Sequence, residues 1–202
     1  MRFLVGIDEV GRGPLAGPIT LCACRVEEGF DFENFKKIKD SKKLSPQKRR
    51  EWFQKISALR AEGLVTFALS SVSAEEIDSK GLSHCIKKAV RNILDDLAAS
   101  PLETEVRLDG SLYAPREFLF QKTIIKGDEK EPVIAAASII AKVTRDKMME
   151  DFALEYPLYG FEENKGYGTA AHKKAIRAYG ITPIHRKSFL SKDLPFIRKS
   201  VY

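Results

Sequence analysis

Cysteine is scarce in this chain of 202 residues, and the three that occur cannot all pair with one another. Cys22 and Cys24 are separated by one residue and Cys85 stands alone, so the paired spacing of a zinc site is absent. Alternation along a strand would place Cys22 and Cys24 on one face, where we interpret them as small buried residues. Free cysteines of this kind favour a reducing compartment, and we therefore expect a cytoplasmic protein.

Histidine is equally rare, with three residues in the whole chain. His84 and His172 fall in two expected helices, and His185 falls in a basic tail. We interpret each as a structural or surface residue rather than a catalyst. Chemistry based on cysteine or histidine therefore has little support.

Long apolar runs are missing as well. No segment is long enough to span a bilayer and no signal peptide is evident, so we expect no membrane partner. The chain also lacks internal repeats, low-complexity tracts and long linkers. Because nothing in the sequence demands a partner chain, we expect a monomer.

What the sequence does contain is enough apolar material for one core, at 44% hydrophobic residues. We therefore expect a single domain over residues 1–202. Lysine and arginine outnumber aspartate and glutamate by 34 to 28, which gives a formal net charge of +6. A basic excess suits a polyanionic partner such as nucleic acid.

The apolar patterning predicts an α/β protein with a mixed sheet and helices on both faces. A helix is well signalled from Ser45, which can cap it, through Pro46 in the first turn to Gly63 at its end. Further helices are expected at 82–100, 132–156 and 169–179, and strands at 3–7, 18–26, 64–72, 105–110 and 118–128.

Four acids stand out because each ends an apolar stretch beside or near a glycine. They are Asp8 and Glu9 after the first strand, Asp109 in "RLDG" and Asp128 in "IKGD". Any one of them alone is more often a turn or capping residue. If the strands ending at Asp8 and Asp109 are adjacent and parallel, however, the carboxylates converge at one edge of the sheet. Such a cluster would be repulsive without cations, and it would suit Mg²⁺ or Mn²⁺.

Glu9 poses a geometric problem, because successive side chains on a strand point to opposite faces. Two solutions remain open at this point. Either the chain twists sharply at Glu9, as the glycines that follow would permit, or the backbone carbonyl of Glu9 contributes to metal binding.

The loop "GRGPLAGP" could be read as a dinucleotide-binding turn, but its glycine spacing is wrong and a strand follows where that motif needs a helix. Gly11, Arg12 and Gly13 offer instead a close backbone approach and a guanidinium. Such a loop could follow a sugar–phosphate chain and test for the 2′-hydroxyl that distinguishes RNA from DNA.

The chain resembles the ribonuclease HII family, the bacterial type 2 ribonucleases H, over nearly its whole length. The resemblance rests on seven motifs in one order: "GIDEVGRGPLAGP", "DSKKLS", "LDG", "KGD", "AAASIIAKVTRD", "NKGYGT" and "GITPIHRKSF". It implies a ribonuclease H-like mixed sheet flanked by helices, with residues from about 157 to 202 forming a C-terminal helical extension.

The resemblance also implies an activity and a set of site residues. The activity is hydrolysis of the phosphodiester 5′ of ribonucleotides, in RNA–DNA hybrids or singly in duplex DNA, leaving 5′-phosphate and 3′-hydroxyl ends during DNA replication and repair. Two divalent cations, Mn²⁺ or Mg²⁺, would be held by Asp8, Glu9, Asp109 and Asp128. The Gly11–Gly13 loop would sense the 2′-hydroxyl, and Tyr167 would stack on the sugar of the following deoxynucleotide.

Other basic and polar residues could contact the substrate backbone. Lys42 and Lys43 in "DSKKLS" could hold phosphates. Ser138 and Lys142 are one helical turn apart and so share a face, which suggests a polar edge turned toward the substrate. Arg186 could extend a basic track, or it could be an ordinary solvated charge.

Two alternatives remain open. The related ribonuclease HIII has an additional N-terminal domain and a lysine in the glycine loop, whereas this chain begins at its first strand and has Arg12. A non-catalytic binder of RNA–DNA hybrids would more naturally have lost one of the four acids. The segment after "HRKSF" carries no obvious clamp-binding peptide, so we do not expect docking to a replication clamp by that route.

Overall fold

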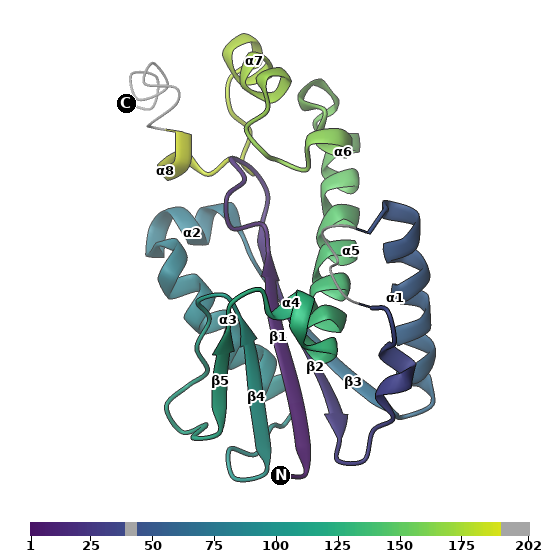
Figure 1. Cartoon of the computed structure of the whole chain (residues 1–202). Coiled ribbons are helices and arrows are strands. Elements are labelled where there is room, and N and C mark those ends of the chain that lie inside the picture. Colours follow the sequence, from purple (N-terminus) through teal and green to yellow (C-terminus); the bar gives the residue numbers. More distant parts are fainter. Residues whose placement is uncertain (39–43, 191–202) are drawn as a thin grey trace. The chain divides into compact units, whose positions relative to one another are not determined.

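The computed structural model describes residues 1–38 and 44–190, and it contains a five-stranded sheet in the order β3-β2-β1-β4-β5 (Figure 1). The strands are β1 (Phe3–Val10), β2 (Ile19–Glu27), β3 (Val65–Val72), β4 (Thr104–Asp109) and β5 (Gln121–Ile124). β1 runs antiparallel to β2 and parallel to β4, and β4 runs parallel to β5. The predicted mixed sheet is confirmed.

Helices of very different length lie between and after these strands in the sequence. The α-helices are α1 (Pro46–Ala61), α2 (Ala74–Lys80), α3 (Leu82–Asp96), α4 (Gly127–Lys130), α5 (Pro132–Glu155), α6 (Phe161–Asn164), α7 (Ala170–Tyr179) and α8 (Lys187–Leu190). Two 3₁₀ turns complete them, η1 (Phe32–Phe35) and η2 (Pro157–Tyr159). In the described ranges no helix combines the length and the apolar character needed to cross a membrane.

The chain divides into two compact units whose segments interleave along the sequence. The first, here the sheet unit, comprises Met1–Val10, Thr20–Ser71 and Ile86–Val143. The second unit comprises Gly11–Ile19, Val72–Cys85 and Thr144–Tyr202. A single catalytic domain over 1–202 with an extension from about 157 stays a prediction.

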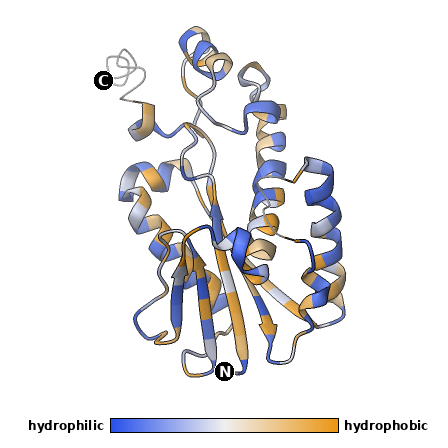
Figure 2. Ribbon diagram, viewed as in Figure 1, coloured by the Kyte–Doolittle hydropathy of each residue, from blue (hydrophilic) through white to orange (hydrophobic). Residues whose placement is uncertain are grey.

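Both faces of β1 are covered within the sheet unit. Gly6 faces α5, since a Cβ built on it would lie 2.4 Å from the carbonyl carbon of Val133. Val5 and Ile7 point the other way by strand alternation, and both are fully buried. Figure 2 shows β1 and β2 as mainly hydrophobic ribbons, as a sheet covered on both faces requires. The prediction of helices on both faces is therefore confirmed.

The core on the α5 side is formed by β2, α1 and α5. Ser45 caps α1 as predicted, because its side chain accepts a hydrogen bond from the backbone N–H of Lys48. The buried residues of this core include Cys22 and Cys24 of β2, Ile56 and Leu59 of α1 and a continuous run in α5. The two cysteines are fully buried, as we expected, and none of the three cysteines, all of which lie in the described ranges, forms a disulfide.

Several elements differ from the sequence prediction, among them the unpredicted short helices α4, α6 and α8. The expected strand over 118–128 is short, because β5 ends at Ile124 and Lys126 takes a left-handed conformation with φ of 55°. Helix α2 was not predicted, although Ser73 caps it by accepting from the N–H of Glu76, three residues on. This Ser-x-x-Glu spacing is a recognisable helix start, and it was the signal that could have revealed α2.

The second unit packs around its own apolar cluster, which includes Leu15, Met149, Phe161 and Ile176. The backbone N–H groups of Leu15 and Ala16 both donate to the carbonyl of Gly166, at 2.8 and 3.2 Å. Gly17 donates in turn to Ile184. The stretch after β1 is thus bonded to two segments that lie about 150 to 170 residues later in the chain.

Candidate active site

Two of the four predicted acids lie at the ends of adjacent parallel strands. β1 and β4 pair in register from Phe3 with Thr104 to Ile7 with Leu108. The next residue on each strand is an acid, Asp8 on β1 and Asp109 on β4. The sequence prediction that these acids meet at one edge depended on this pairing, and the pairing is confirmed.

Asp8 is a buried carboxylate with incomplete hydrogen bonding. Its side chain is 1% exposed, its Oδ1 accepts from the backbone N–H of Glu9 at 2.7 Å, and the Ser138 side chain also bonds to it. Its Oδ2 is buried without a hydrogen-bond partner. Burial raises the pKa of Asp8 well above its ordinary value, and the nearby charges of Asp109 and Glu9 raise it further.

Asp128 is held next to Asp109 by a tight turn. The backbone N–H of Gly127 donates to Oδ1 of Asp109 at 2.6 Å. A Cβ at Gly127 would lie 2.6 Å from Cδ1 of Ile134, so the turn packs closely against α5. Asp128 follows at once, and it is 2% exposed. The acid therefore reaches this edge from a one-turn helix rather than from a strand end, which corrects the sequence expectation.

Glu9 remains part of a regular strand. It pairs with Leu21 of β2, and the register continues to Val10 opposite Thr20. The chain does not twist sharply at Glu9, since the first left-handed residue is Gly11 with φ of 89°. Of the two solutions considered from the sequence, the twist is absent, and a contribution by the Glu9 backbone carbonyl stays a prediction.

The donor chemistry at this edge fits a hard divalent cation, although the side chains are not arranged around one. In the described ranges no group of three or more His, Cys, Asp and Glu side chains is placed to hold a metal ion. The buried Oδ2 of Asp8, repelled by two neighbouring carboxylates, is nevertheless an oxygen donor that a cation would satisfy. We therefore take this edge of the sheet unit as the candidate metal site.

Ser138 and Lys142 extend this region along α5. Ser138 is buried and bonds to Asp8, so its hydroxyl supports a carboxylate in this structure. Lys142 lies one turn further on and is half-buried. Substrate contact by either residue stays a prediction, and Lys42 and Lys43 lie outside the described residues.

The Gly11–Gly13 loop belongs to the second unit, and its two glycines have different surroundings. At Gly11, whose φ is 89°, a Cβ would lie 2.3 Å from Nε of Arg145. At Gly13 a Cβ would meet no atom within 4 Å, and the backbone is not left-handed. Arg12 between them is exposed. Packing against Arg145 therefore explains why position 11 requires a glycine, whereas no such contact explains the glycine at position 13.

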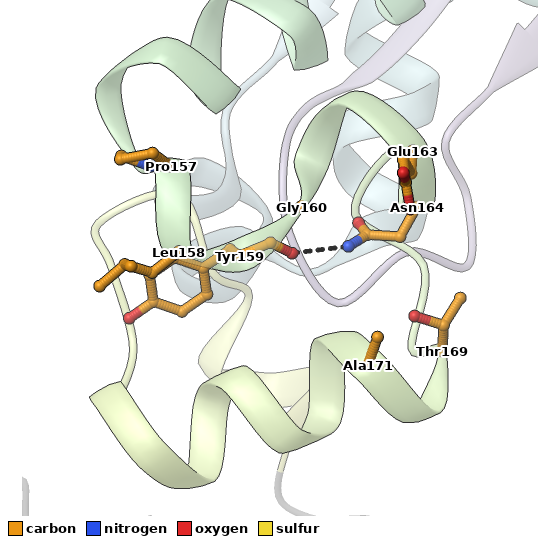
Figure 3. Close-up of a pocket in the computed structure, with 8 residues that line it drawn as sticks. All are labelled: Pro157, Leu158, Tyr159, Gly160, Glu163, Asn164, Thr169 and Ala171. Carbon is orange, nitrogen blue, oxygen red and sulfur yellow. Dashed lines mark hydrogen bonds between the residues drawn. The ribbon is translucent and has the colours of Figure 1, made fainter.

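Tyr167 lies in a hydrogen-bonded turn, and the residue is 42% exposed. Asn164 shapes the turn: its Nδ2 donates to the carbonyl of Tyr159 at 2.7 Å, and its Oδ1 accepts from the N–H of Gly166 at 2.8 Å. Figure 3 shows the first of these bonds at the wall of a pocket of about 560 Å³. Glu163 is the one ionisable acid or base among its lining side chains apart from the Tyr159 phenol, so we assign the pocket no catalytic role.

Comparison with known proteins decides the family. The family model described as Ribonuclease HII matches residues 5–192. This chain belongs to the ribonuclease HII family. It is 46% identical to ribonuclease HII of Shouchella clausii over 91% of this chain and 67% of that protein, and 42% identical to that of Bacillus subtilis over 93% and 69%.

Solved structures agree with the ribonuclease HII assignment. The ribonuclease H2 from Pyrococcus horikoshii OT3 matches with a TM-score of 0.73 at 25% identity, covering 98% of this chain and 100% of that one. The ribonuclease HII of a complex with PCNA from Archaeoglobus fulgidus matches with a TM-score of 0.74 at 25% identity, covering 92% and 94%. Ribonucleases HII are metal-dependent endoribonucleases of the ribonuclease H type, and this chain falls in that class.

The two histidines of the second unit form a buried pair that sequence reasoning left as structural. Thr182 donates its N–H to Nδ1 of His185 at 2.9 Å, which places the His185 proton on Nε2. That nitrogen lies 3.1 Å from Nε2 of His172, whose Nδ1 lies 2.9 Å from the carbonyl of Tyr167. Each of these hydrogen bonds has one donor and one acceptor only when both imidazole rings are neutral.

We expect this pair to make the ribonuclease HII fold sensitive to acid. Burial, followed by the charge of His172, lowers the pKa of His185 from 6.5 to about 4. Between these two values the unfolded chain binds the proton and the folded chain does not, so stability falls as the pH drops from 6.5 toward 4. At about 1.4 kcal/mol per pKa unit, the loss is about 3 kcal/mol.

The measurement is the urea-unfolding free energy at pH 7 and pH 4.5, for the wild type and for His185→Gln. Glutamine can donate in place of Nε2 but does not titrate, so the acid-induced loss should shrink in this variant. The matched control is His84→Asn, because His84 is exposed on α3. An equal loss in the wild type and His185→Gln would contradict the prediction.

Proposed function

We propose that this chain is an endonuclease that cuts the phosphodiester 5′ of ribonucleotides, both in RNA–DNA hybrids and at single ribonucleotides in duplex DNA. The products would carry 5′-phosphate and 3′-hydroxyl ends. In the cell this activity would act in the cytoplasm to remove ribonucleotides during DNA replication and repair. The proposal joins the family's metal-dependent endoribonuclease activity to the particular residues of this chain.

One observation supports the catalytic part more than any other: the buried Oδ2 of Asp8 has no hydrogen-bond partner and faces like charges. We assign Asp8, Glu9, Asp109 and Asp128 as the residues that hold two divalent cations, Mg²⁺ or Mn²⁺. Two such ions supply an activated water and stabilise the leaving oxygen in phosphodiester hydrolysis. Because no group of three among the described acids is placed to hold an ion, binding would require some of these side chains to move.

The protein's own residues orient two of these four carboxylates before any ion binds. The N–H of Glu9 and the Ser138 side chain orient the Asp8 carboxylate, and the N–H of Gly127 orients that of Asp109. Fixed oxygens lose less conformational entropy when they bind a ligand. Ser138 then acts as a support for Asp8, while Lys142, Lys42 and Lys43 are proposed to contact the substrate backbone.

The second unit supports recognition of the ribonucleotide. Gly13 is a glycine that no internal contact requires, which is what the close approach of an outside sugar–phosphate chain would explain. Arg12 beside it is exposed, and its guanidinium is proposed to contact the ribose. The exposed ring of Tyr167 is proposed to stack on the following deoxynucleotide.

The deciding test is incision of a DNA duplex that carries one ribonucleotide, with Mg²⁺ or Mn²⁺. We expect a single cut on the 5′ side of the ribonucleotide and a 3′ end that a DNA polymerase extends. The controls are the same duplex without the ribonucleotide, the reaction with chelator, and the Asp109→Asn variant. Binding without incision would favour the hybrid-binding alternative, and efficient cutting of long hybrids alone would favour a ribonuclease HIII-like specificity.

We propose that the enzyme acts as a monomer. The Archaeoglobus fulgidus relative forms a complex with PCNA. We do not extend that interaction to this chain, because the sequence after Phe189 contains no recognisable clamp-binding peptide.

A further inference from the structure

A buried guanidinium of the second unit is bonded to the backbone of the glycine loop. Arg186 is fully buried. Its Nη2 donates to the carbonyl of Gly11 at 2.7 Å, its Nη1 to that of Arg12 at 3.1 Å, and its Nε and Nη2 to that of Gly17 at 3.0 and 2.8 Å. Four bonds from one side chain therefore hold three peptide groups of the loop, about 170 residues earlier in the chain.

A second buried arginine holds the end of the same loop, which runs over residues 11–18. Arg145 of α5 is also fully buried, and it donates to the carbonyls of Ala16, Pro18 and Lys165 at 3.3, 2.9 and 2.9 Å. It also lies against Gly11, where a side chain would collide with it. The sequence indicated neither role, because arginines in a basic protein are expected at the surface, and Arg186 in particular was considered a solvated charge or part of a basic track.

The chemistry of these bonds indicates that they determine the loop's shape. Burial and, after it, the nearby charge of Arg145 lower the pKa of Arg186 from 12.5 to about 10, so placing the two arginines together is electrostatically costly. Every hydrogen-bond acceptor given above for the two side chains is a backbone carbonyl, and none is a carboxylate. The nearby acid Asp78 accepts instead from the N–H groups of Lys187 and Ser188. A planar fork of donors that bonds only to peptide oxygens fixes the orientation of those peptides.

We propose that Arg186 is a positioning residue that fixes the Gly11 and Arg12 peptides, so that the loop is formed before the substrate arrives and can discriminate a 2′-hydroxyl. This inference rests on the function proposed above. The side chain is fully enclosed and acts through the loop rather than by touching the nucleic acid. A loop that is ordered before binding avoids the entropic cost of becoming ordered on the substrate. Its contacts to the 2′-hydroxyl then contribute more of their free energy to the affinity for a ribonucleotide.

The test compares binding of two duplexes, one all-DNA and one with a single ribonucleotide, to the wild type and to Arg186→Lys with Ca²⁺ in place of a catalytic ion. Lysine keeps the charge but cannot bond to three carbonyls in a plane. We expect the preference for the ribonucleotide duplex to fall about tenfold, with binding to the all-DNA duplex unchanged. The matched control is Arg25→Lys, since Arg25 donates to the carbonyl of Leu97 within the sheet unit.

Each outcome decides the question. If the wild type shows no incision and no preference, the proposed function fails; if it shows both and Arg186→Lys keeps the full preference, the positioning role fails. An equal loss on both duplexes would also overturn it, because a general structural defect does not select for the 2′-hydroxyl. Should the variant not fold, hydrogen exchange of the wild type decides: the Gly11–Gly17 amides must be as protected in the free protein as with the ribonucleotide duplex bound.

Discussion

Replacing Asp8 by asparagine is expected to stabilise the metal-free protein and to reduce cleavage by at least about a hundredfold. The loss of activity follows from removing a carboxylate that we assign to the metal site, where ions contribute several kcal/mol to phosphodiester hydrolysis. The gain in stability follows from removing a charge that is buried beside Asp109 and Glu9. A substitution that merely damaged the fold would lower both quantities.

The sign of the stability effect follows from the pKa of Asp8. Its folded-state pKa lies well above the ordinary 3.8, so the folded protein prefers the protonated carboxyl. Stability is lost as the pH rises from 3.8 through the raised value, and at neutral pH the wild type carries that cost. Asp8→Asn should therefore have a higher free energy of unfolding than the wild type at pH 7.

The measurements are unfolding free energies at pH 7 with and without Mn²⁺. The wild type should gain stability from Mn²⁺ because the ion binds the folded state, and Asp8→Asn should gain much less. Asp151→Asn serves as the control, because Asp151 is an exposed acid paired with Lys147. A variant that is less stable than the wild type without metal and equally stabilised by Mn²⁺ would contradict the assignment of Asp8.

The carboxylate edge could be predicted because local signals encode it. Asp8 and Asp109 each follow an apolar strand, and parallel pairing of those strands brings them to one edge. The local structure at Asp128 was harder to predict, because "TIIKGD" has the pattern of a strand that continues to the acid. The structure turns instead at Lys126, and the Gly127 N–H bond to Asp109 joins segments 18 residues apart. A contact of that kind leaves no trace in a local pattern.

The buried arginines could not be predicted for a related reason. Charge and hydropathy place arginine at the surface, and it is buried only where acceptors gather around it. For Arg186 those acceptors are carbonyls of Gly11, Arg12 and Gly17, which the fold brings from the opposite end of the sequence. Sequence reasoning identified the loop that recognition would use, but not the side chains that hold it.

Gly6, at the centre of the sheet, also makes a close contact that the local sequence does not reveal. Of the substitutions proposed for this protein, the one at Gly6 has the largest expected effect on the free energy of unfolding. Gly6 lies on β1, which has β2 on one side and β4 on the other. A Cβ at this position would lie 2.4 Å from the carbonyl carbon of Val133 and 2.5 Å from the nitrogen of Ile134. These are backbone atoms of the first turn of α5, so no side-chain rotation can relieve the collision.

Gly6→Ala is therefore expected to lower the unfolding free energy by about 3 kcal/mol or more, since β1 or α5 must shift. The same shift would separate Ser138 on α5 from Asp8 on β1, so cleavage by the remaining folded protein should fall as well. Gly13→Ala is the matched control for stability, because a Cβ there meets open space. We expect its unfolding free energy to stay within about 0.5 kcal/mol of the wild type. If both alanines left urea unfolding unchanged, β1 and α5 could not be as close as the Gly6 contact requires, and the support that Ser138 gives to Asp8 would have to be abandoned.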